Sequence, residues 1–407
     1  MAKENFIVGL DIGSTKVAAT CGEITEGTTN INGFVKVPNN GVRRGVVVDI
    51  EDTISAISEA LEQLERTSGA RISSAVIGIS GSHIAISISK GVIAVARADG
   101  EIGPSDIERV IEAARTVALP PNREIIYVIP KTYTVDGQSG ITDPIGMTGI
   151  RLEVESLVIS GAISSIKNLT KCVEQAGLEI QSLVFSPIAS AQLLLNKKQK
   201  EIGVALLDMG GGTTSLMVYE EGNILHAAVI PIGSSHITND LAIGLRTSVE
   251  VAEKIKIKYG SAIPDKIREA ETISLSQFDP GDNQRIERKY VSEIIQARLG
   301  EIFALVNMEL KKAGKEGMLP AGVVLTGGGS KLEDLTEACK EELRLPAALG
   351  HPIVEMGGFV DKLTDPVYAT SVGLMLSALE GPNAKFRHFG TQGVYNKAKN
   401  FFKQFLP

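Results

Sequence analysis

The sequence contains no tryptophan, and aromatic residues make up only 4% of its 407 residues. A surface that binds RNA or single-stranded DNA by aromatic stacking is therefore disfavoured. The formal net charge of −7 also argues against a nucleic-acid partner. At this length, one hydrophobic core is rarely enough, so we expect at least two domains.

The sequence also lacks paired cysteines and long apolar runs. Its three cysteines, Cys21, Cys172 and Cys339, form no C-x-x-C pair, which gives no support to a zinc site or a redox dithiol. No apolar run reaches the ~18 residues that a membrane-spanning helix needs, and the N-terminus does not resemble a signal peptide. We expect reduced, buried thiols in a protein that is cytosolic or attached to a membrane from the cytosolic side.

An internal repeat is the main positive feature. Residues 6–17 read FIVGLDIGSTKV, and residues 204–215 read VALLDMGGGTTS. Each segment predicts an apolar strand, an aspartate, a Gly-rich turn with hydroxyl residues, and a second strand. The two aspartates, Asp11 and Asp208, lie almost half a chain length apart. This spacing predicts two similar α/β halves, each of which begins with a β-hairpin.

The two hairpin tips are predicted to bind phosphate. Glycine and hydroxyl residues in such a tip leave backbone N–H groups free to converge on phosphate oxygens. The nearby aspartates would repel phosphate unless a cation lies between them, so we expect Mg²⁺ held by Asp11 and Asp208 through water. A third cluster, Gly327–Gly329 after a buried strand, allows close approach of an adenosine. The chain has no Walker A motif, and no G-x-G-x-x-G follows a strand.

These observations predict a cleft that binds ATP and Mg²⁺ between the two halves. The predicted nucleotide-binding residues of the three turns are Asp11, Gly13, Ser14, Thr15, Lys16, Asp208, Gly210, Gly211, Gly212, Thr213, Thr214, Gly327, Gly328 and Gly329.

These residues resemble the motifs of the superfamily of actin, heat-shock chaperones and sugar kinases. The resemblance implies two duplicated actin-like (ribonuclease-H-like) α/β domains around a nucleotide cleft, with a small inserted subdomain in each half. Glu250 and Lys254, one helical turn apart, look like the superfamily's adenine and ribose contacts; a solvated salt bridge is the alternative. Segments 186–191 and 365–374 look like its two connecting helices, whose small residues allow close crossing.

The chain is divided on this basis into six parts. The insertion contains strand-like runs at 84–88, 92–96, 125–135 and 155–159 and one helix at 105–117. The predicted parts are a first core domain (1–82 and 163–198), an inserted α/β subdomain for interaction or polymerisation (83–162), a second core domain (199–236 and 322–380), its small subdomain (237–321), a linker (381–393) and a terminal helix (394–407).

Three features resemble the FtsA family of bacterial cell-division proteins: the sequence GVRRGVVVD at 41–49, the place of the insertion, and the C-terminal segment described below. This resemblance implies an ATP-binding protein that polymerises and tethers filaments of FtsZ to the inner face of the cytoplasmic membrane at the division site. It also implies the recruitment of later division proteins. The FtsZ tail is acidic and apolar in this family, so a basic receptor is expected; a solvated helix face is the alternative. The candidate receptor residues are Arg285, Arg288, Lys289 and Arg298.

The C-terminal segment 394–407 reads VYNKAKNFFKQFLP, with apolar residues on one helical stripe and lysines off it. A basic amphipathic helix of this kind lies in a membrane interface. Burial of its apolar groups and lysine attraction to anionic lipid contribute a gross ~10 kcal/mol, which ordering of the segment largely offsets. We therefore expect firm attachment only after self-association; docking on the protein's own surface is the alternative. The predicted membrane residues are Val394, Lys397, Lys399, Phe401, Phe402, Lys403, Phe405 and Leu406.

The sequence identifies no catalytic residue. Ser186 and Gln192 are the polar residues near the first connecting segment, and neither fits a catalytic glutamine. We therefore expect nucleotide binding with at most slow ATP hydrolysis. Two alternatives stay open at this point. One is another bacterial actin-like cytoskeletal or pilus-assembly protein, and the other is a soluble small-molecule kinase of the same superfamily.

Overall fold

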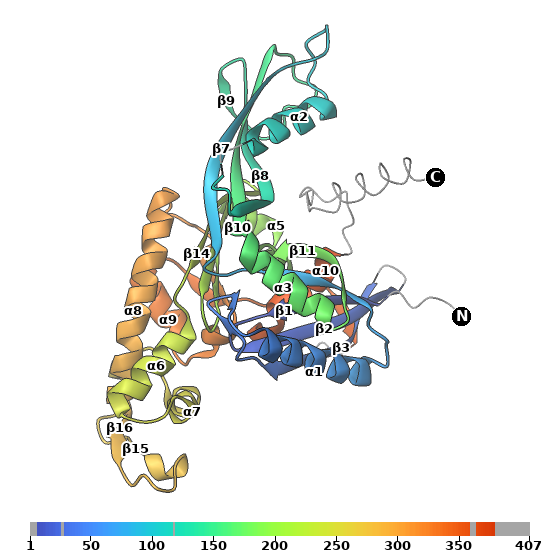
Figure 1. Ribbon diagram of the computed structural model, residues 1–407. Helices are drawn as coiled ribbons and strands as arrows, with labels where there is room; N and C mark the ends of the chain where they lie inside the picture. Colours follow the sequence, from blue (N-terminus) through green and yellow to red (C-terminus); the bar gives the residue numbers. More distant parts are fainter. Residues whose placement is uncertain (1–5, 26–27, 117–118, 359–363, 379–407) are drawn as a thin grey trace.

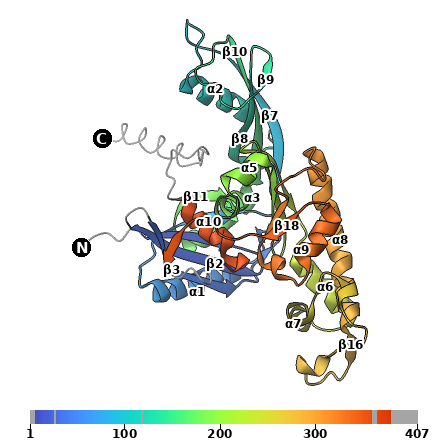
Figure 2. The same ribbon diagram turned by 180° about the vertical axis from the view of Figure 1, so that it is seen from behind.

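The computed structural model describes residues 6–25, 28–116, 119–358 and 364–378. Figure 1 shows two central sheets side by side, with one subdomain projecting from each half at opposite ends of the molecule. The view from behind in Figure 2 shows the same arrangement. The duplicated α/β organisation predicted from the repeat is therefore present.

The first sheet has the strand order β11-β6-β1-β2-β3-β19. Helix α1 (Ile50–Ser68) packs on one face; the side chain of Asp49 caps its start, and Gly69 in the left-handed region ends it. Helix α3 (Ile163–Gln175) lies on the same face. The strands are β1 (Ile7–Ile12), β2 (Lys16–Thr25), β3 (Thr28–Pro38), β6 (Ser74–Ile79), β11 (Glu179–Phe185) and β19 (Met356–Gly358).

The second sheet repeats this topology in the order β14-β13-β12-β17-β18. In both sheets the first strand pairs antiparallel with the second and parallel with a later strand: β1 with β2 and β6, β12 with β13 and β17. The strands are β12 (Val204–Met209), β13 (Thr214–Glu220), β14 (Asn223–Ile230), β17 (Val323–Thr326) and β18 (Ala347–Leu349). The other elements of this half are α5 (Lys197–Ile202), α6 (Ser234–Leu245), α7 (Val249–Tyr259), β15 (Thr272–Ser274), β16 (Arg285–Glu287), α8 (Arg288–Lys312) and α9 (Leu335–Leu343).

The two halves are joined where helices α4 (Ser186–Leu194) and α10 (Ala369–Ser377) cross. A Cβ on Gly373 would lie 2.1 Å from the carbonyl oxygen of Ala189, and a Cβ on Gly9 would lie 2.1 Å from that of Ser371. The crossing of α4 and α10 therefore requires glycine at position 373, and Gly9 of β1 lets α10 pack closely on the first sheet. This confirms the prediction that small residues bring two connecting helices together.

The inserted subdomain is a four-stranded sheet in the order β7-β10-β8-β9, with α2 (Pro104–Arg115) on one face. Its strands are β7 (Ile84–Ala94), β8 (Arg123–Val135), β9 (Gln138–Ile141) and β10 (Arg151–Ala162). The prediction of two strands at 84–88 and 92–96 is wrong, because β7 runs through Gly91. That glycine makes room for α2: a Cβ there would lie 2.1 Å from the carbonyl oxygen of Val110.

All three cysteines are buried and free, as predicted. Within the described ranges, no helix has the length and apolar character needed to cross a bilayer. The linker at 381–393 and the terminal helix at 394–407 lie outside the described residues, so both remain predictions.

Candidate nucleotide site

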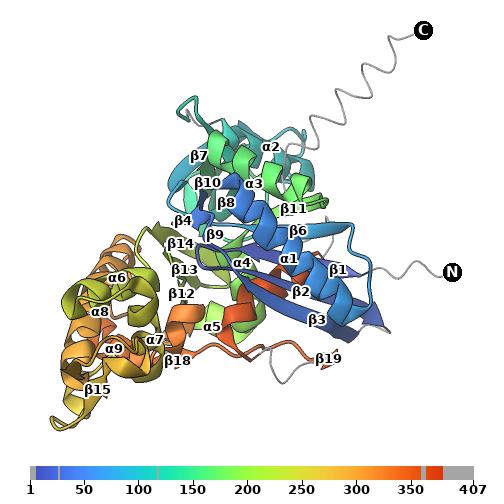
Figure 3. The same ribbon diagram turned by 60° about the horizontal axis from the view of Figure 1, so that its bottom comes forward.

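A cavity of about 1110 Å³ lies between the two halves. Both hairpin tips, the third glycine cluster and one side of α7 line it. Figure 3 shows the small subdomain of α6–α9 on one side of this junction and the β1–β3 hairpins on the other. Fourteen of the sixteen predicted nucleotide-binding residues are among its lining residues; Thr214 and Lys254 are not.

The two hairpin tips have the same backbone geometry. Residues 13–16, which we call loop 1, are closed by a hydrogen bond of 2.8 Å from the Gly13 N–H to the Lys16 carbonyl. Residues 210–213, or loop 2, are closed by the equivalent bond of 2.9 Å from Gly210 to Thr213. Asp11 and Asp208 occupy matching places, since each is paired one position before the last pair of its hairpin. The two halves of the internal repeat therefore share the same closing hydrogen bond and the same position of the aspartate.

Loops 1 and 2 face each other across the cavity. A Cβ on Gly211 would lie 2.5 Å from Cγ2 of Thr15, and a Cβ on Gly212 would lie 2.5 Å from Oγ of Ser14. Hydroxyl side chains of loop 1 therefore occupy the space that the glycines of loop 2 leave open. This places backbone N–H groups of one loop opposite hydroxyl groups of the other, an arrangement suited to anionic oxygens.

The two aspartates differ in their surroundings. Lys16 Nζ lies 2.9 Å from Asp11 Oδ2, whereas Thr370 Oγ1 lies 3.5 Å from Asp208 Oδ2. Burial, and then the nearby charge of Asp11, raise the pKa of Asp208 to about 6. A pair of close carboxylates with a single lysine is electrostatically suited to a cation. The described residues contain no cluster of three or more metal-ligating side chains, so a cation here would keep other ligands, such as water.

The third glycine cluster lies against Asp208 and the end of β12. A Cβ on Gly327, which has a φ of 83°, would lie 2.3 Å from Asp208 Oδ1. A Cβ on Gly329 would lie 2.8 Å from the Met209 carbonyl oxygen. Gly328 is more open, with its nearest neighbour 3.8 Å away. Glycine is therefore needed here for close backbone packing beside the cavity.

The structure corrects two of the predicted contacts. The Thr214 hydroxyl donates to the Ile232 carbonyl at 2.8 Å and is buried behind loop 2, rather than facing the cavity. Lys254 is exposed and lies off the face of α7 that lines the cavity, whereas Glu250 lies on it. The residues of α7 that line the cavity are Val249, Glu250, Glu253, Lys256, Ile257 and Lys258.

Glu253 and Lys256 are lining residues that the sequence analysis missed. Lys256 is buried; its Nζ lies 2.7 Å from Glu253 Oε2 and donates to Thr238 Oγ1 at 2.8 Å. Burial lowers the pKa of Lys256 despite the partner carboxylate. Lys256 follows Ala252 by one helical turn, and both are buried with Val251 and Ile255, whereas Lys254 is exposed.

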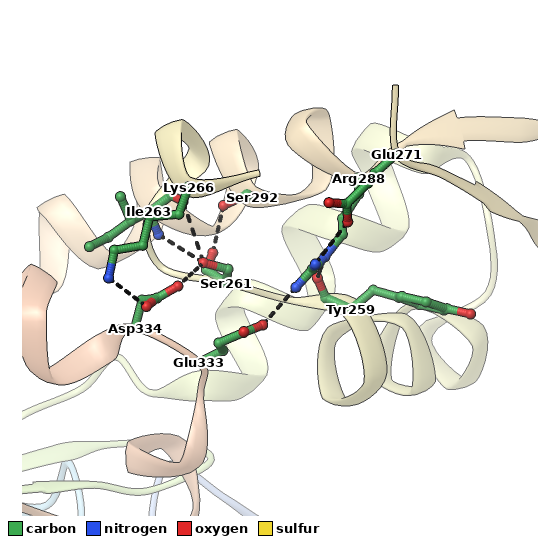
Figure 4. Close-up of polar contacts among 9 residues, drawn as sticks. All are labelled: Tyr259, Ser261, Ile263, Lys266, Glu271, Arg288, Ser292, Glu333 and Asp334. Carbon is green, nitrogen blue, oxygen red and sulfur yellow. Dashed lines mark hydrogen bonds and ion pairs between the residues drawn. The ribbon is translucent and has the colours of Figure 1, made fainter. Parts of the chain in front are cut away.

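The four predicted partner-binding cations do not form one free basic groove. Figure 4 shows Arg288 between Glu271 and Glu333, at 2.9 and 2.6 Å, beside a second network around Ser261 and Asp334. These bonds connect α8 to the segment that follows the third glycine cluster. Arg288 therefore has a structural role that the sequence prediction did not foresee.

The other three cations lie in different surroundings. Arg298 forms a bidentate ion pair with Asp240 at 2.6 and 2.9 Å and also contacts Glu301. Lys289 lies 3.9 Å from Glu269, and Arg285 is exposed on β16. Asp240 and Glu269 are distant in sequence from the cations they meet, which is why those cations looked available.

Comparison with known proteins identifies the family. A family sequence model described as "Cell division protein FtsA" matches residues 205–373, and one described as "SHS2 domain inserted in FTSA" matches residues 81–160. The chain is 40% identical to Cell division protein FtsA of Pseudomonas aeruginosa over 92% of this chain and 89% of that protein. The FtsA of Bacillus subtilis is 37% identical over 96% of this chain and 87% of that protein. The chain belongs to the FtsA family.

Solved structures agree with the predicted fold class. The PilM–PilN type IV pilus biogenesis complex matches with a TM-score of 0.67 at 16% identity, over 92% of this chain and 98% of that chain. MreB5 of Spiroplasma citri bound to ADP matches with a TM-score of 0.52 at 12% identity, over 93% and 97% of the two chains. At these identities the likeness concerns the fold alone. The chain is thus a cell-division protein of the FtsA family with two actin-like domains, and the small-molecule kinase alternative loses its support.

Proposed function

We propose that this protein binds ATP with Mg²⁺ in the cavity and polymerises on the inner face of the cytoplasmic membrane. There it tethers FtsZ filaments at the division site and recruits later division proteins. The observation that carries the proposal is the pair of matching hairpin loops that face each other across one cavity in a member of a cell-division family.

The residues of the cavity fit a nucleoside triphosphate and its cation. Loops 1 and 2 would hold the phosphates through backbone N–H groups and the hydroxyls of Ser14 and Thr15. Asp11 and Asp208 would hold Mg²⁺ through water, which would relieve the repulsion that raises the pKa of Asp208. Glu253 and Lys256 take the place beside the sugar and base that the sequence had suggested for Lys254. When bound, the cation supplies charge neutralisation between carboxylates and phosphate.

Hydrolysis is expected to be slow at most. Ser186 lines the cavity, is 6% exposed, and its Oγ would lie 2.8 Å from a Cβ on Gly78. Gln192 is not among the lining residues. A neutral hydroxyl orients water but is a weak general base at neutral pH. The surroundings of Ser186 therefore favour a protein that responds to bound ATP more than one that turns it over rapidly.

A tail receptor is expected on the small subdomain, close to the α6–α8 contact. Gly244 brings these helices together, since a Cβ there would lie 2.6 Å from Ile294 Cδ1. Beside this contact, Ile243 is 77% exposed and Tyr290 is 44% exposed. An acidic and apolar FtsZ tail would find apolar side chains here, with exposed Arg285 nearby on β16 leading into α8. We propose this surface in place of a purely basic groove.

The test combines membrane and partner binding. Full-length protein and a chain ending at Gly390 are incubated with Mg-ATP and sedimented with vesicles that contain anionic lipid, with and without an FtsZ tail peptide. We expect the full chain to pellet and carry the peptide with it, and the shortened chain to stay in solution while still binding the peptide. If the shortened chain pellets equally, residues 394–407 are not the anchor; if neither chain binds the peptide, the tether proposal is wrong.

A further inference from the structure

The segment 41–49, which carries the family resemblance, has no role in the function described so far. It forms a small hairpin of β4 (Val42–Arg43) and β5 (Val46–Val47). Its two turn residues, Arg44 and Gly45, have φ angles of 50° and 73°. Two successive left-handed residues are typical of a tight two-residue hairpin. The turn therefore has a fixed shape, and Gly45 lines the cavity.

On one side, this segment holds loop 1. The Gly45 N–H donates to Ser14 Oγ at 3.0 Å. Asn39, which is buried just before the hairpin, donates from Nδ2 to the Gly13 carbonyl at 2.8 Å and from its backbone N–H to the Thr15 carbonyl at 3.1 Å. Two carbonyl groups of loop 1 and the hydroxyl oxygen of Ser14 are thus bonded by residues 39–45.

The same turn also touches loop 2. A Cβ on Gly212 would lie 2.8 Å from the backbone nitrogen of Arg44 and 2.9 Å from its Cα. The Arg44–Gly45 turn therefore lies where the two loops meet. A change in the separation of the loops has to move this turn or break its contacts.

On its other side, the turn contacts the start of the inserted subdomain. The Ser82 N–H donates to the Arg44 carbonyl at 2.8 Å. Gly45 and Gly81 are in close backbone contact, since a Cβ on Gly45 would lie 2.4 Å from Cα of Gly81 and one on Gly81 would lie 2.7 Å from the Gly45 carbonyl oxygen. Residues 80–83 connect β6 of the core to β7 of the subdomain.

Arg123 joins the strands at the base of that subdomain. Its Nη2 donates to the His83 carbonyl and to the Ser160 carbonyl, both at 2.8 Å, and its Nε donates to Ser160 Oγ at 3.1 Å. His83 directly precedes β7, Arg123 begins β8, and Ser160 lies near the end of β10. One guanidinium therefore holds together the three strand ends through which the subdomain is attached.

We propose that the Arg44–Gly45 turn positions loop 1 and transmits occupancy of the cavity to the inserted subdomain through residues 80–83 and Arg123. The inference rests on the proposed function, because it requires a ligand with phosphate groups in the cavity. Binding draws loops 1 and 2 onto one ligand, the turn between them moves with them, and the glycine contact leaves no space to absorb that movement. The base of the subdomain then shifts as a unit.

The test is hydrogen exchange of the full chain, measured by mass spectrometry with and without Mg-ATP. We expect about threefold slower exchange in loops 1 and 2, in residues 80–88 and in residues 158–162. In Arg123→Gln, we expect Mg-ATP still to slow exchange in loops 1 and 2 but no longer in residues 158–162. Arg109→Gln serves as the matched control, because Arg109 bonds Asp106 and Ala94 within the subdomain and away from its base. In Arg109→Gln, exchange should still slow both in loops 1 and 2 and in residues 158–162.

The outcomes separate this inference from the proposed function. Protection of the loops in the wild type without any change at 80–88 or 158–162 would overturn the inference alone, as would a full subdomain response in Arg123→Gln. No ATP-dependent protection anywhere would overturn the proposed function and the inference with it. Should Arg123→Gln fold poorly, Arg123→Lys retains one donor and is expected to give a reduced response, and the wild-type comparison needs no variant.

Discussion

Loops 1 and 2 have the same backbone but different chemistry. Each is closed by one hydrogen bond between its first and fourth residues, yet loop 1 carries Ser14, Thr15 and Lys16 where loop 2 carries glycine or threonine. The glycines of loop 2 leave the space that the hydroxyls of loop 1 occupy. The two duplicated loops therefore share one backbone conformation. Loop 1 supplies the side chains, and the glycines of loop 2 leave the space in which those side chains lie.

The supports of the two loops differ in the same way. Loop 1 is held by the side chain of Asn39 and by the Arg44–Gly45 turn. Loop 2 is held by the first turn of α6, where the backbone N–H groups of Ser234 and Ser235 donate to the Gly210 and Gly211 carbonyls, both at 2.9 Å. A backbone support tolerates side-chain changes that a side-chain support does not. The three predictions that follow test the contacts of loop 2, the two aspartates and the side of α7 that lines the cavity.

The largest effect is expected at Gly212 of loop 2, where no space exists for a side chain. In Gly212→Ala the added Cβ would lie within 2.9 Å of Ser14 Oγ and of two backbone atoms of Arg44. The halves must separate, and we expect Mg-ATP affinity to fall about 100-fold in calorimetric titration. Gly300→Ala is the control, because nothing lies within 4 Å of that Cβ in the middle of α8. It should keep its affinity and gain up to ~1 kcal/mol of stability. Wild-type affinity in Gly212→Ala would contradict the contact.

The two aspartates are expected to differ in their effect on stability. The pKa of Asp208 is raised to about 6, above the ~3.9 of an unfolded chain. The folded protein without nucleotide is therefore destabilised progressively as the pH rises from about 4 to 6, and the loss persists at higher pH. Asp208→Asn removes this loss, so its free energy of unfolding should exceed that of the wild type by about 3 kcal/mol at pH 8 and match it below pH 4.

Urea unfolding at both pH values measures this difference. Asp11→Asn is the matched variant and should show a smaller gain, because it relieves the repulsion of Asp208 but takes from Lys16 the carboxylate that lies 2.9 Å from its Nζ. With saturating Mg-ATP, the wild type should instead be more stable than Asp208→Asn, since an amide at position 208 cannot attract the cation. A stability gain in Asp208→Asn that is the same at pH 4 and pH 8 would contradict the electrostatic explanation.

The smallest effects are expected on α7. Lys256→Met removes a buried ammonium that lines the cavity and bonds Thr238 and Glu253. We expect about tenfold weaker Mg-ATP binding. Lys254→Met changes the same residue type two positions away on the exposed face, and its affinity should stay within about twofold of the wild type. Equal losses in both variants, measured with a fluorescent ATP analogue, would show that the cavity-lining face of α7 is assigned wrongly.

Local patterns predicted what is local in the structure. The hairpins and the connecting helices follow from apolar periodicity and glycine turns within a few residues. Glycine was misleading in β7, where Gly91 marks the close approach of α2 rather than a turn. Spacing alone also could not separate Lys254 from Lys256, because that choice depends on which side of α7 the cavity lies.

Long-range pairing is what the sequence could not predict. Arg298 meets Asp240, and Arg288 meets Glu333, only after α6, α8 and the third glycine cluster have packed together. Thr214 looked like a ligand because it follows the three glycines of loop 2, but its hydroxyl donates to the carbonyl of Ile232, between β14 and α6. The positions of the loops could be predicted from the sequence, whereas the residues that hold them in place could not.

The central claim is that loops 1 and 2 meet across one nucleotide. The most direct test adds a methyl group to loop 2 and removes one from loop 1. A Cβ on Gly211 would lie 2.5 Å from Cγ2 of Thr15, so Gly211→Ala alone should weaken Mg-ATP binding about tenfold. Thr15→Ser removes that methyl group and, with Gly211→Ala, should restore affinity to within about threefold of the wild type. If the losses of the two single variants simply add in the double variant, the loops do not meet across one nucleotide.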